Sequence, residues 1–212
     1  EIVTGFDVHS YTASVLTAAG EPTSRQDAKA STFAPLYGGG GGTKAQKEYA
    51  IAFKEKYNGI STTQKEWTME VLDSGRLRTA YGMVFHWPGT RMNTKGYVDN
   101  TTSIYNFGIQ GMATAEIIPI ALAYFWQRSK HLRCSVFNTI HDSICARVNK
   151  EDMQEAKDLA KQSMTYDVYK FLEDVYDYRF TVPLGIGLKV AKHWSDTKEE
   201  EVVDVWPDGR EV

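Results

Sequence analysis

The stretch Arg25-Gln-Asp-Ala-Lys29-Ala-Ser-Thr-Phe33-Ala-Pro-Leu-Tyr37-Gly38 places two cations and then two aromatic rings four residues apart. On an α-helix this spacing puts Arg25, Lys29, Phe33 and Tyr37 on one face. Cations bind phosphates through charge-assisted hydrogen bonds, and flat rings stack on bases. The stretch therefore predicts a helix from about residue 24 whose face suits a nucleoside triphosphate. From spacing alone, an amphipathic helix with buried rings and solvated cations is an equally open interpretation.

Pro35 interrupts this predicted helix. A proline in a helix interior removes a hydrogen bond and clashes with the carbonyl four residues back, at a cost of about 3 kcal/mol. The helix is therefore expected either to end near Phe33 or to kink there. The glycines at 38–42 then predict a turn. This turn is not a phosphate-binding P-loop, because Thr43 and Ala45 replace the glycine and the hydroxyl residue that flank the lysine of that motif.

Composition indicates a soluble globular protein of one large or two small domains. The chain has 212 residues, of which 42% are hydrophobic and 24% are charged. Its formal net charge is −3, but residues 199–212 hold six acids and one base, which leaves a net +2 for residues 1–198. The body can therefore carry a basic cleft, and the overall charge does not exclude a nucleic-acid partner.

The two cysteines, Cys134 and Cys145, form no metal-ligand spacing, so a zinc site is not expected. Their positions on a predicted hairpin are out of register for a disulfide, since residue 145 would pair with residue 138. Reduced thiols, together with the lack of a signal-peptide pattern and of an apolar run of membrane-span length, predict a cytoplasmic protein with no membrane partner.

The remaining helices and strands follow from hydrophobic period and turn residues. The helices are expected to begin near Phe6, capped by Asp7 or Ser10, and then to cover the ranges 43–74 (as two helices that meet at Asn58-Gly59), 101–128 (with a bend at Pro119) and 151–177. Strand-like and turn-like segments are expected at 75–98, at 135–148 as a β-hairpin with His141-Asp142 at its tip, and at 180–190. The acidic residues after Lys198 are expected to form a loose tail or an interaction arm.

The pattern Arg-x3-Lys-x3-Phe-x3-Tyr-Gly resembles the fingers helix of family A DNA polymerases. Within it, the run Thr32-Phe-Ala-Pro-Leu-Tyr-Gly38, followed by glycines, is closer to the phage-type branch. Three further segments that resemble the family occur in the family's order. They are Asp7-x-His9-x-x-Thr-Ala, Asn106-x3-Gln110-Gly and His141-Asp142.

This resemblance implies a role for each matching residue. Nucleotide-binding residues would be His9, Arg25, Lys29, Phe33 and Tyr37, with Lys29 also protonating the leaving pyrophosphate. Asn106 and Gln110 would read the minor groove of the primer-template, where every correct base pair offers acceptors at similar places, and His141 would support the primer end. Asp142 would bind Mg²⁺ in a two-metal site. The implied partners are dNTPs and primer-template DNA.

The implied fold is α+β, with a mostly helical fingers subdomain at 1–100, the C-terminal part of a palm with a small antiparallel sheet at 101–198, and an acidic tail at 199–212. The second catalytic aspartate of the family lies before the position matched by His9. We therefore expect this motif A, the thumb and any exonuclease to come from another polypeptide or segment, and the chain alone to be inactive.

Two departures from the family pattern keep an alternative open. Thr102 replaces an arginine that the family often has four residues before Asn106, and Ser143 replaces a glutamate that commonly follows the aspartate. With the missing motif A, Ser143 favours the alternative function, a non-catalytic nucleic-acid-binding or regulatory protein derived from a polymerase. For either function, the expected location is the cytoplasm of a bacterium or of a phage-infected host cell.

Overall fold

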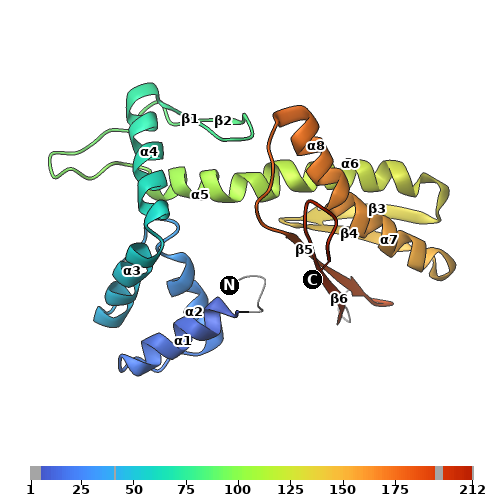
Figure 1. The fold of residues 1–212 in the computed structure, drawn as a ribbon, viewed down its shortest axis with the longest axis horizontal. Coiled ribbons are helices and arrows are strands. Elements are labelled where there is room, and N and C mark those ends of the chain that lie inside the picture. The colour runs from blue at the N-terminus through green and yellow to red at the C-terminus, as the bar shows by residue number, and fades with distance from the viewer. Residues whose placement is uncertain (1–5, 41, 194–197, 212) are drawn as a thin grey trace. The chain divides into compact units, whose positions relative to one another are not determined.

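The computed structural model describes residues 6–40, 42–193 and 198–211. The described residues form two compact units (Figure 1). Unit 1 contains the residues up to Thr79 together with Met83–Ile109, and unit 2 contains Ala80–Gly82 together with the residues from Gln110 onward. The division falls inside helix α5 (Thr101–Gly111). The mixture of helices with small antiparallel sheets confirms the predicted α+β class.

Unit 1 consists of four helices and a short hairpin before α5. The elements are α1 (Val8–Ala18), α2 (Arg25–Phe33), α3 (Lys44–Lys56), α4 (Asn58–Ser74), β1 (Arg76–Arg78) and β2 (Val84–His86). Local sequence explains the helix starts, since Asp7 caps α1, Ser24 caps α2, and Thr43 with Gln46 forms a capping box on α3. The predicted break near Asn58-Gly59 is confirmed, with Tyr57 between α3 and α4.

Helix α2 ends at Phe33 and does not kink, which settles the two outcomes expected from Pro35. After Phe33 the chain tightens into turns in which Leu36 donates to the carbonyl of Phe33. Gln64 of α4 holds these turns, because its buried side chain donates to the carbonyls of Pro35 at 2.9 Å and of Leu36 at 2.8 Å. Gly41, in the predicted glycine turn, lies outside the described residues.

The core of unit 1 joins α4, β1 and α5. Val71, Leu77 and Ile104 are almost fully buried there, and Trp67, Trp87 and Tyr105 pack against them. Tyr105 also fixes the position of the turn after α2. Gly38 has a φ of +77°, and a Cβ atom at this position would lie 2.7 Å from the Tyr105 ring, so only glycine fits.

Unit 2 begins where the long helix changes its winding. Helix α5 runs into a π-helix, Met112–Ile117, and then into α6 (Ile118–Arg128). The elements that follow are β3 (Cys134–Ile140), β4 (Ser143–Val148), α7 (Met153–Met164), α8 (Tyr166–Tyr176), β5 (Leu184–Val190) and β6 (Lys198–Val205). The core of this unit contains Ile120, Ala121, Val168 and Leu172, from α6 and α8.

The predicted hairpin at 135–148 is confirmed as β3 and β4, with His141 and Asp142 at its tip. Asn138 pairs with Cys145 as expected, and a bulge between Val136 and Asn138 shifts the register further along the strands. Both cysteines are free.

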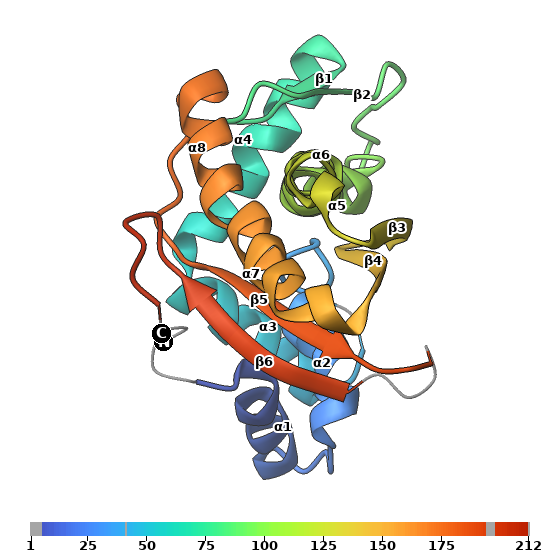
Figure 2. The ribbon, with the colours of Figure 1, turned by 90° about the vertical axis from the view of Figure 1, so that its right-hand side faces the viewer.

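Two predictions for the C-terminal part were wrong. The single helix expected at 151–177 is interrupted at Thr165, whose φ of −125° and ψ of −80° lie outside the helical range and whose hydroxyl bonds to the carbonyl of Lys161. The acidic segment after Lys198 is not loose, because β6 pairs antiparallel with β5 (Figure 2). Buried Tyr169 secures this pairing, as its hydroxyl donates to the carbonyl of Val205 and accepts from the amide of Leu184.

The expectation that no segment reaches membrane-span length was also wrong by length and composition. The continuous helix Thr101–His131 has an 18-residue window of mean hydropathy 1.2. Part of this helix, around Ile120, Ala121 and Phe125, is buried in the core of unit 2, and a core helix meets the same criterion.

Candidate nucleotide-binding and metal-binding sites

In unit 1 the structure brings together the residues predicted to bind a nucleotide. His9 lies in the first turn of α1, while Arg25, Lys29 and Phe33 lie four residues apart along α2, which packs against α1. The ring of His9 meets the ring of Phe33 edge-on with centroids 5.2 Å apart. Tyr37 lies beyond the end of α2, yet its ring is 6.5 Å from that of Phe33. The predicted row of two cations and two rings therefore persists past the end of the helix.

The two cations of α2 differ in their surroundings. The Nε of Arg25 bonds to the Asp7 carboxylate at 2.7 Å, and this hydrogen bond holds the pKa of Asp7 well below its usual range. Lys29 is half-buried and has no hydrogen-bond or ion-pair partner among the described residues. A lysine that loses part of its hydration without gaining a partner is poised to bind an anion.

A chain of hydroxyl groups connects His9 to the interior of unit 1. Nδ1 of His9 lies 3.2 Å from the Thr32 hydroxyl, which is 2.9 Å from the Thr12 hydroxyl, which in turn is 2.8 Å from the hydroxyl of Tyr49. Thr12 and Thr32 are almost fully buried, and burial raises the pKa of Tyr49. The chain fixes the His9 ring on the surface of α1.

The hydroxyl chain also bears on the tautomer of His9. Thr32 lies 2.9 Å from the carbonyl of Ala28 as well. When Thr32 gives its single proton to a neighbouring oxygen, it accepts the proton of Nδ1 of His9. Nε2 of the neutral ring is then an acceptor, so the ring donates to a phosphate only when Nε2 also carries a proton.

Sequence reasoning missed this network and the Arg25 partner. Asp7 was proposed only as a cap, and Thr12, Thr32, Tyr49 and Gln64 were not proposed as functional residues. The available signal was their polarity, because threonine and glutamine at otherwise buried helix positions require hydrogen-bond partners.

On helix α5 the two residues predicted to read the minor groove lie four apart, as expected from helical geometry. Asn106 is half-buried and, within the described part of the chain, has no hydrogen-bond partner, whereas Gln110 is exposed. The division between the units falls just before Gln110, so Asn106 belongs to unit 1 and Gln110 to unit 2.

In unit 2 the predicted metal ligand stands at an exposed turn. His141 and Asp142 are both exposed, and the hydroxyl of Ser143 closes the turn by donating to the carbonyl of Ile140 at 2.9 Å. His141 has a φ of +52°, in the left-handed region that only a minority of non-glycine residues adopt. Beneath the turn, Ile144 packs against the core of unit 2. The backbone of the turn is therefore held in place by the Ser143 hydrogen bond and by the packing of Ile144.

The described residues alone do not form a metal site. No group of three or more His, Cys, Asp or Glu side chains lies together in the ranges 6–40, 42–193 and 198–211. Divalent cations such as Mg²⁺ take oxygen ligands from one or two carboxylates plus phosphates and water. Asp142 could supply one of these ligands, and the others would have to come from a nucleotide, from water or from a further carboxylate.

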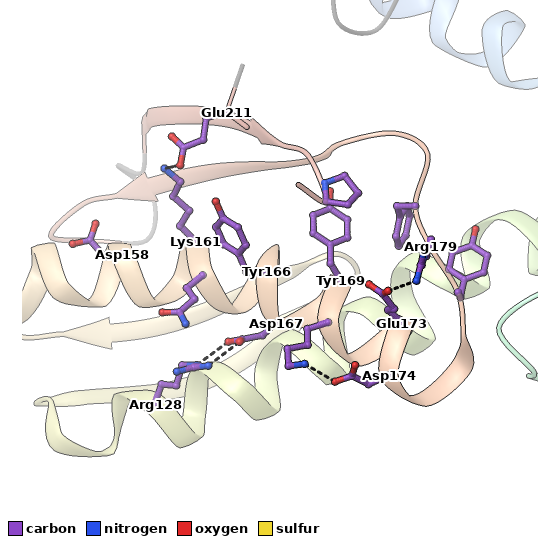
Figure 3. A pocket seen from close by; sticks show the side chains of 15 residues that line it. Arg128, Asp158, Lys161, Tyr166, Asp167, Tyr169, Glu173, Asp174, Arg179 and Glu211 are labelled. Atoms are coloured by element: carbon purple, nitrogen blue, oxygen red, sulfur yellow. Dashed lines mark hydrogen bonds and ion pairs between the residues drawn. The ribbon is translucent and has the colours of Figure 1, made fainter. Parts of the chain in front are cut away.

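A groove in unit 2, with a volume of about 1110 Å³, is a different place (Figure 3). As far as the described residues go, its lining contains none of the residues predicted from the sequence. Its cations are already paired with acids, as Arg128 is with Asp167 at 2.7 Å and Arg179 is with Glu173 at 2.6 Å. Each cation among the described lining residues is therefore already paired with an acid, and the groove leaves none of them for an anionic ligand.

Comparison with known proteins gives a consistent result. The family model for DNA polymerase family A matches residues 2–196. The thermostable DNA polymerase I of Thermus filiformis is 26% identical over 210 residues, which cover 92% of this chain and 24% of that protein. DNA polymerase I of Streptococcus pneumoniae serotype 4 is 29% identical over 182 residues, which cover 76% of this chain and 20% of that protein. The chain thus spans about a quarter of the length of these relatives.

A solved structure has a similar fold. The POL domain of Pol1 from M. smegmatis, in complex with DNA primer-template and dNTP, superimposes with a TM-score of 0.64 at 23% sequence identity. The match covers 78% of this chain and 32% of that domain. Strand β6 begins at Lys198, beyond the residues that the family model matches.

Proposed function

Because this chain belongs to DNA polymerase family A, we propose that it contributes the fingers and the C-terminal part of the palm to a DNA-directed DNA polymerase that adds dNTPs to a primer. One observation carries the proposal. Unit 1 sets His9, Arg25, Lys29, Phe33 and Tyr37 in one continuous row, with a half-buried lysine that has no partner among the described residues.

The two ends of the row bind different parts of the incoming nucleotide. Arg25, Lys29 and the Nε2–H of His9 in its imidazolium form bind the triphosphate, while Phe33 packs on the sugar and Tyr37 lies by the templating base. Lys29 is also the proton donor for the leaving pyrophosphate, since it is the cation without a competing carboxylate. A phosphate that binds Nε of Arg25 displaces Asp7, so at this atom the triphosphate competes with an existing ion pair.

Asn106 and Gln110 of helix α5 read the minor groove, and His141 supports the primer end. Asp142, exposed at its turn, would supply one oxygen ligand to Mg²⁺. The metal would stabilise negative charge on the phosphates. A second carboxylate is required to hold it, and we propose that this carboxylate, the thumb and any exonuclease belong to further segments or chains of the polymerase.

Two parts of the proposal rest on the sequence alone. The run after Lys29 favours the phage-type branch, although the relatives described above are bacterial enzymes. The cytoplasm of a bacterium or of a phage-infected cell is the proposed location, since primer-template DNA and dNTPs are available there.

The proposal is tested by nucleotide binding to this chain, measured by titration calorimetry with a dNTP. We expect Lys29→Ala to weaken binding about 10- to 100-fold, because a charge-assisted hydrogen bond contributes roughly 1.5–3 kcal/mol. Lys47→Ala is the matched control, since Lys47 is an exposed lysine of α3 away from the row.

Equal affinities of the Lys29→Ala and Lys47→Ala variants would refute the assignment of the nucleotide site. Binding of nucleotide and DNA by the chain, with no primer extension once the remaining polymerase segments are supplied, would instead indicate the non-catalytic alternative.

A further inference from the structure

The long helix of the chain changes its winding after Gly111, one residue beyond Gln110. In the π-helix Met112–Ile117, the amide of Ile118 donates to the carbonyl of Ala113, five residues back. Pro119 follows at once and explains the wider turn, because its ring would clash with the carbonyl of residue 115 in a regular α-helix. Such single π-turns are rare and occur frequently at functional sites.

A π-turn adds one residue to a helical turn, so it rotates the faces before and after it by about 100° relative to each other. In this chain the turn is anchored on its apolar side, where Met112 and Ile117 pack against the core of unit 2. The polar side of the turn carries Thr114 and Glu116, whose side chains form hydrogen bonds to Gln110 and Tyr176.

Thr114 connects the turn to Gln110. Its hydroxyl donates to the carbonyl of Gln110 at 3.0 Å. The carbonyl of Gln110 is thus bound to a side chain of the π-turn. A displacement of the turn would therefore move the backbone of Gln110.

Glu116 connects the same turn to α8. This half-buried carboxylate accepts from the hydroxyl of Tyr176 at 3.3 Å, and no other hydrogen-bond partner of Glu116 lies among the described residues. Tyr176 is itself held in place, since its ring packs against Phe171 with centroids 5.8 Å apart. Burial and the charge of Glu116 raise the pKa of Tyr176, so its hydroxyl keeps its proton and remains a donor at neutral pH.

We propose that the Tyr176–Glu116 hydrogen bond locks the π-turn and thereby sets the direction in which Gln110 faces the minor groove. Tyr176 and Glu116 are positioning residues for recognition of the primer-terminal base pair, and neither touches the DNA. This inference rests on the proposed function, because it assigns Gln110 its role.

The first test measures the turn itself, by hydrogen exchange of backbone amides in peptides that cover residues 112–118. Tyr176→Phe removes the donor and should speed exchange in these peptides several-fold. Tyr178→Phe is the matched control, since Tyr178 lies two residues away and its hydroxyl has no hydrogen-bond partner among the described residues. Glu116→Gln keeps an acceptor oxygen and should retain most of the protection, whereas Glu116→Ala should not.

The second test measures binding of the chain to primer-templates with a matched or a mismatched 3′-terminal pair, by fluorescence anisotropy. We expect the wild-type chain to prefer the matched pair, and Tyr176→Phe to reduce this preference several-fold while overall affinity changes less. A purely structural role would instead lower the unfolding temperature and leave the matched-to-mismatched ratio unchanged.

The outcomes separate the two proposals. If no variant binds any primer-template, the proposed function fails, while the exchange data still decide whether the lock exists. Unchanged exchange at residues 112–118 in Tyr176→Phe overturns the lock. Faster exchange with an unchanged ratio overturns its role in positioning Gln110.

Discussion

In unit 1 the candidate side chains are joined to one another and, through buried hydroxyls, to the core, whereas in unit 2 Asp142 stands at a hairpin tip with only its backbone held. His9 reaches Tyr49 through Thr32 and Thr12, and Arg25 is already paired with Asp7. The turn at Asp142 is fixed by Ser143 and by the packing of Ile144 beneath it.

This difference indicates how the two sites depend on their surroundings. A nucleotide site whose groups are held in place from within loses little side-chain freedom when it binds its ligand. A single exposed carboxylate gains strong metal affinity only when other oxygen ligands converge on the same ion. Unit 1 should therefore bind a nucleotide on its own, whereas Asp142 should matter only in the assembled polymerase.

The largest expected effect tests the second half of this comparison. In primer extension by the active polymerase that contains this chain, Asp142→Asn should lower turnover about 10³-fold or more, since a lost metal ligand costs several kcal/mol. The unfolding temperature should not change, because asparagine suits turns as well as aspartate does.

Asp177→Asn provides the control for this measurement. Asp177, like Asp142, is exposed at a turn, and its φ of +52° lies in the left-handed region, which asparagine tolerates. The assignment of Asp142 is wrong if both variants extend primers equally well.

The next effect in size tests the hydroxyl chain. Thr32→Val keeps the shape of the side chain but leaves the hydroxyl of Thr12 and Nδ1 of His9 without their shared partner. A buried polar group that loses its partner costs about 1–3 kcal/mol, and we expect a loss of that size in urea unfolding followed in unit 1.

Thr62→Val is the comparison for Thr32→Val, because Thr62 is an exposed threonine of a neighbouring helix, α4. Its loss should remain within about 0.5 kcal/mol. Nucleotide affinity should also fall in Thr32→Val only, since His9 loses its anchor. Equal stability of the two variants would show that the chain of hydroxyls does not hold the site together.

The local features of both regions could be predicted from the sequence. The four-residue spacing of α2 and the β-branched runs around His141-Asp142 each act over a few neighbours, and the structure has both elements where they were expected. Pro35 restricted the end of α2 to two outcomes, and long-range support from Gln64 accompanies the one observed.

The longer connections could not be predicted, because they have no periodic signal. Thr12 and Tyr49 are separated by 37 residues, and Tyr176 and Glu116 by 60. At the C-terminus the acidic composition led to the prediction of a loose tail. The weaker strand signal was the alternation of Val203 and Val205, which pair with Ile186 and Leu184 in the structure. Pairing with the hydrophobic strand β5, earlier in the chain, makes this segment a strand.

The smallest expected effect concerns the ion pair that a triphosphate must open. Asp7→Asn keeps a side-chain oxygen to cap α1 but removes the negative charge beside Arg25. Nucleotide affinity should rise about two- to fivefold, because an exposed ion pair is screened by water and is opened at little cost. Weaker binding would show instead that Asp7 positions Arg25 for the phosphates.

The same ion pair predicts a pH dependence with a defined sign. Since the pKa of Asp7 is lowered in the folded chain, the stabilisation it provides is complete above the ordinary aspartate pKa of about 3.9 and is lost as the pH falls toward the lowered value. Wild type should therefore unfold at a slightly higher temperature than Asp7→Asn at neutral pH, and the difference should shrink below about pH 4. A difference that stays constant down to acid pH would mean that the charge of Asp7 contributes nothing to stability, and that Arg25 is free for a ligand from the start.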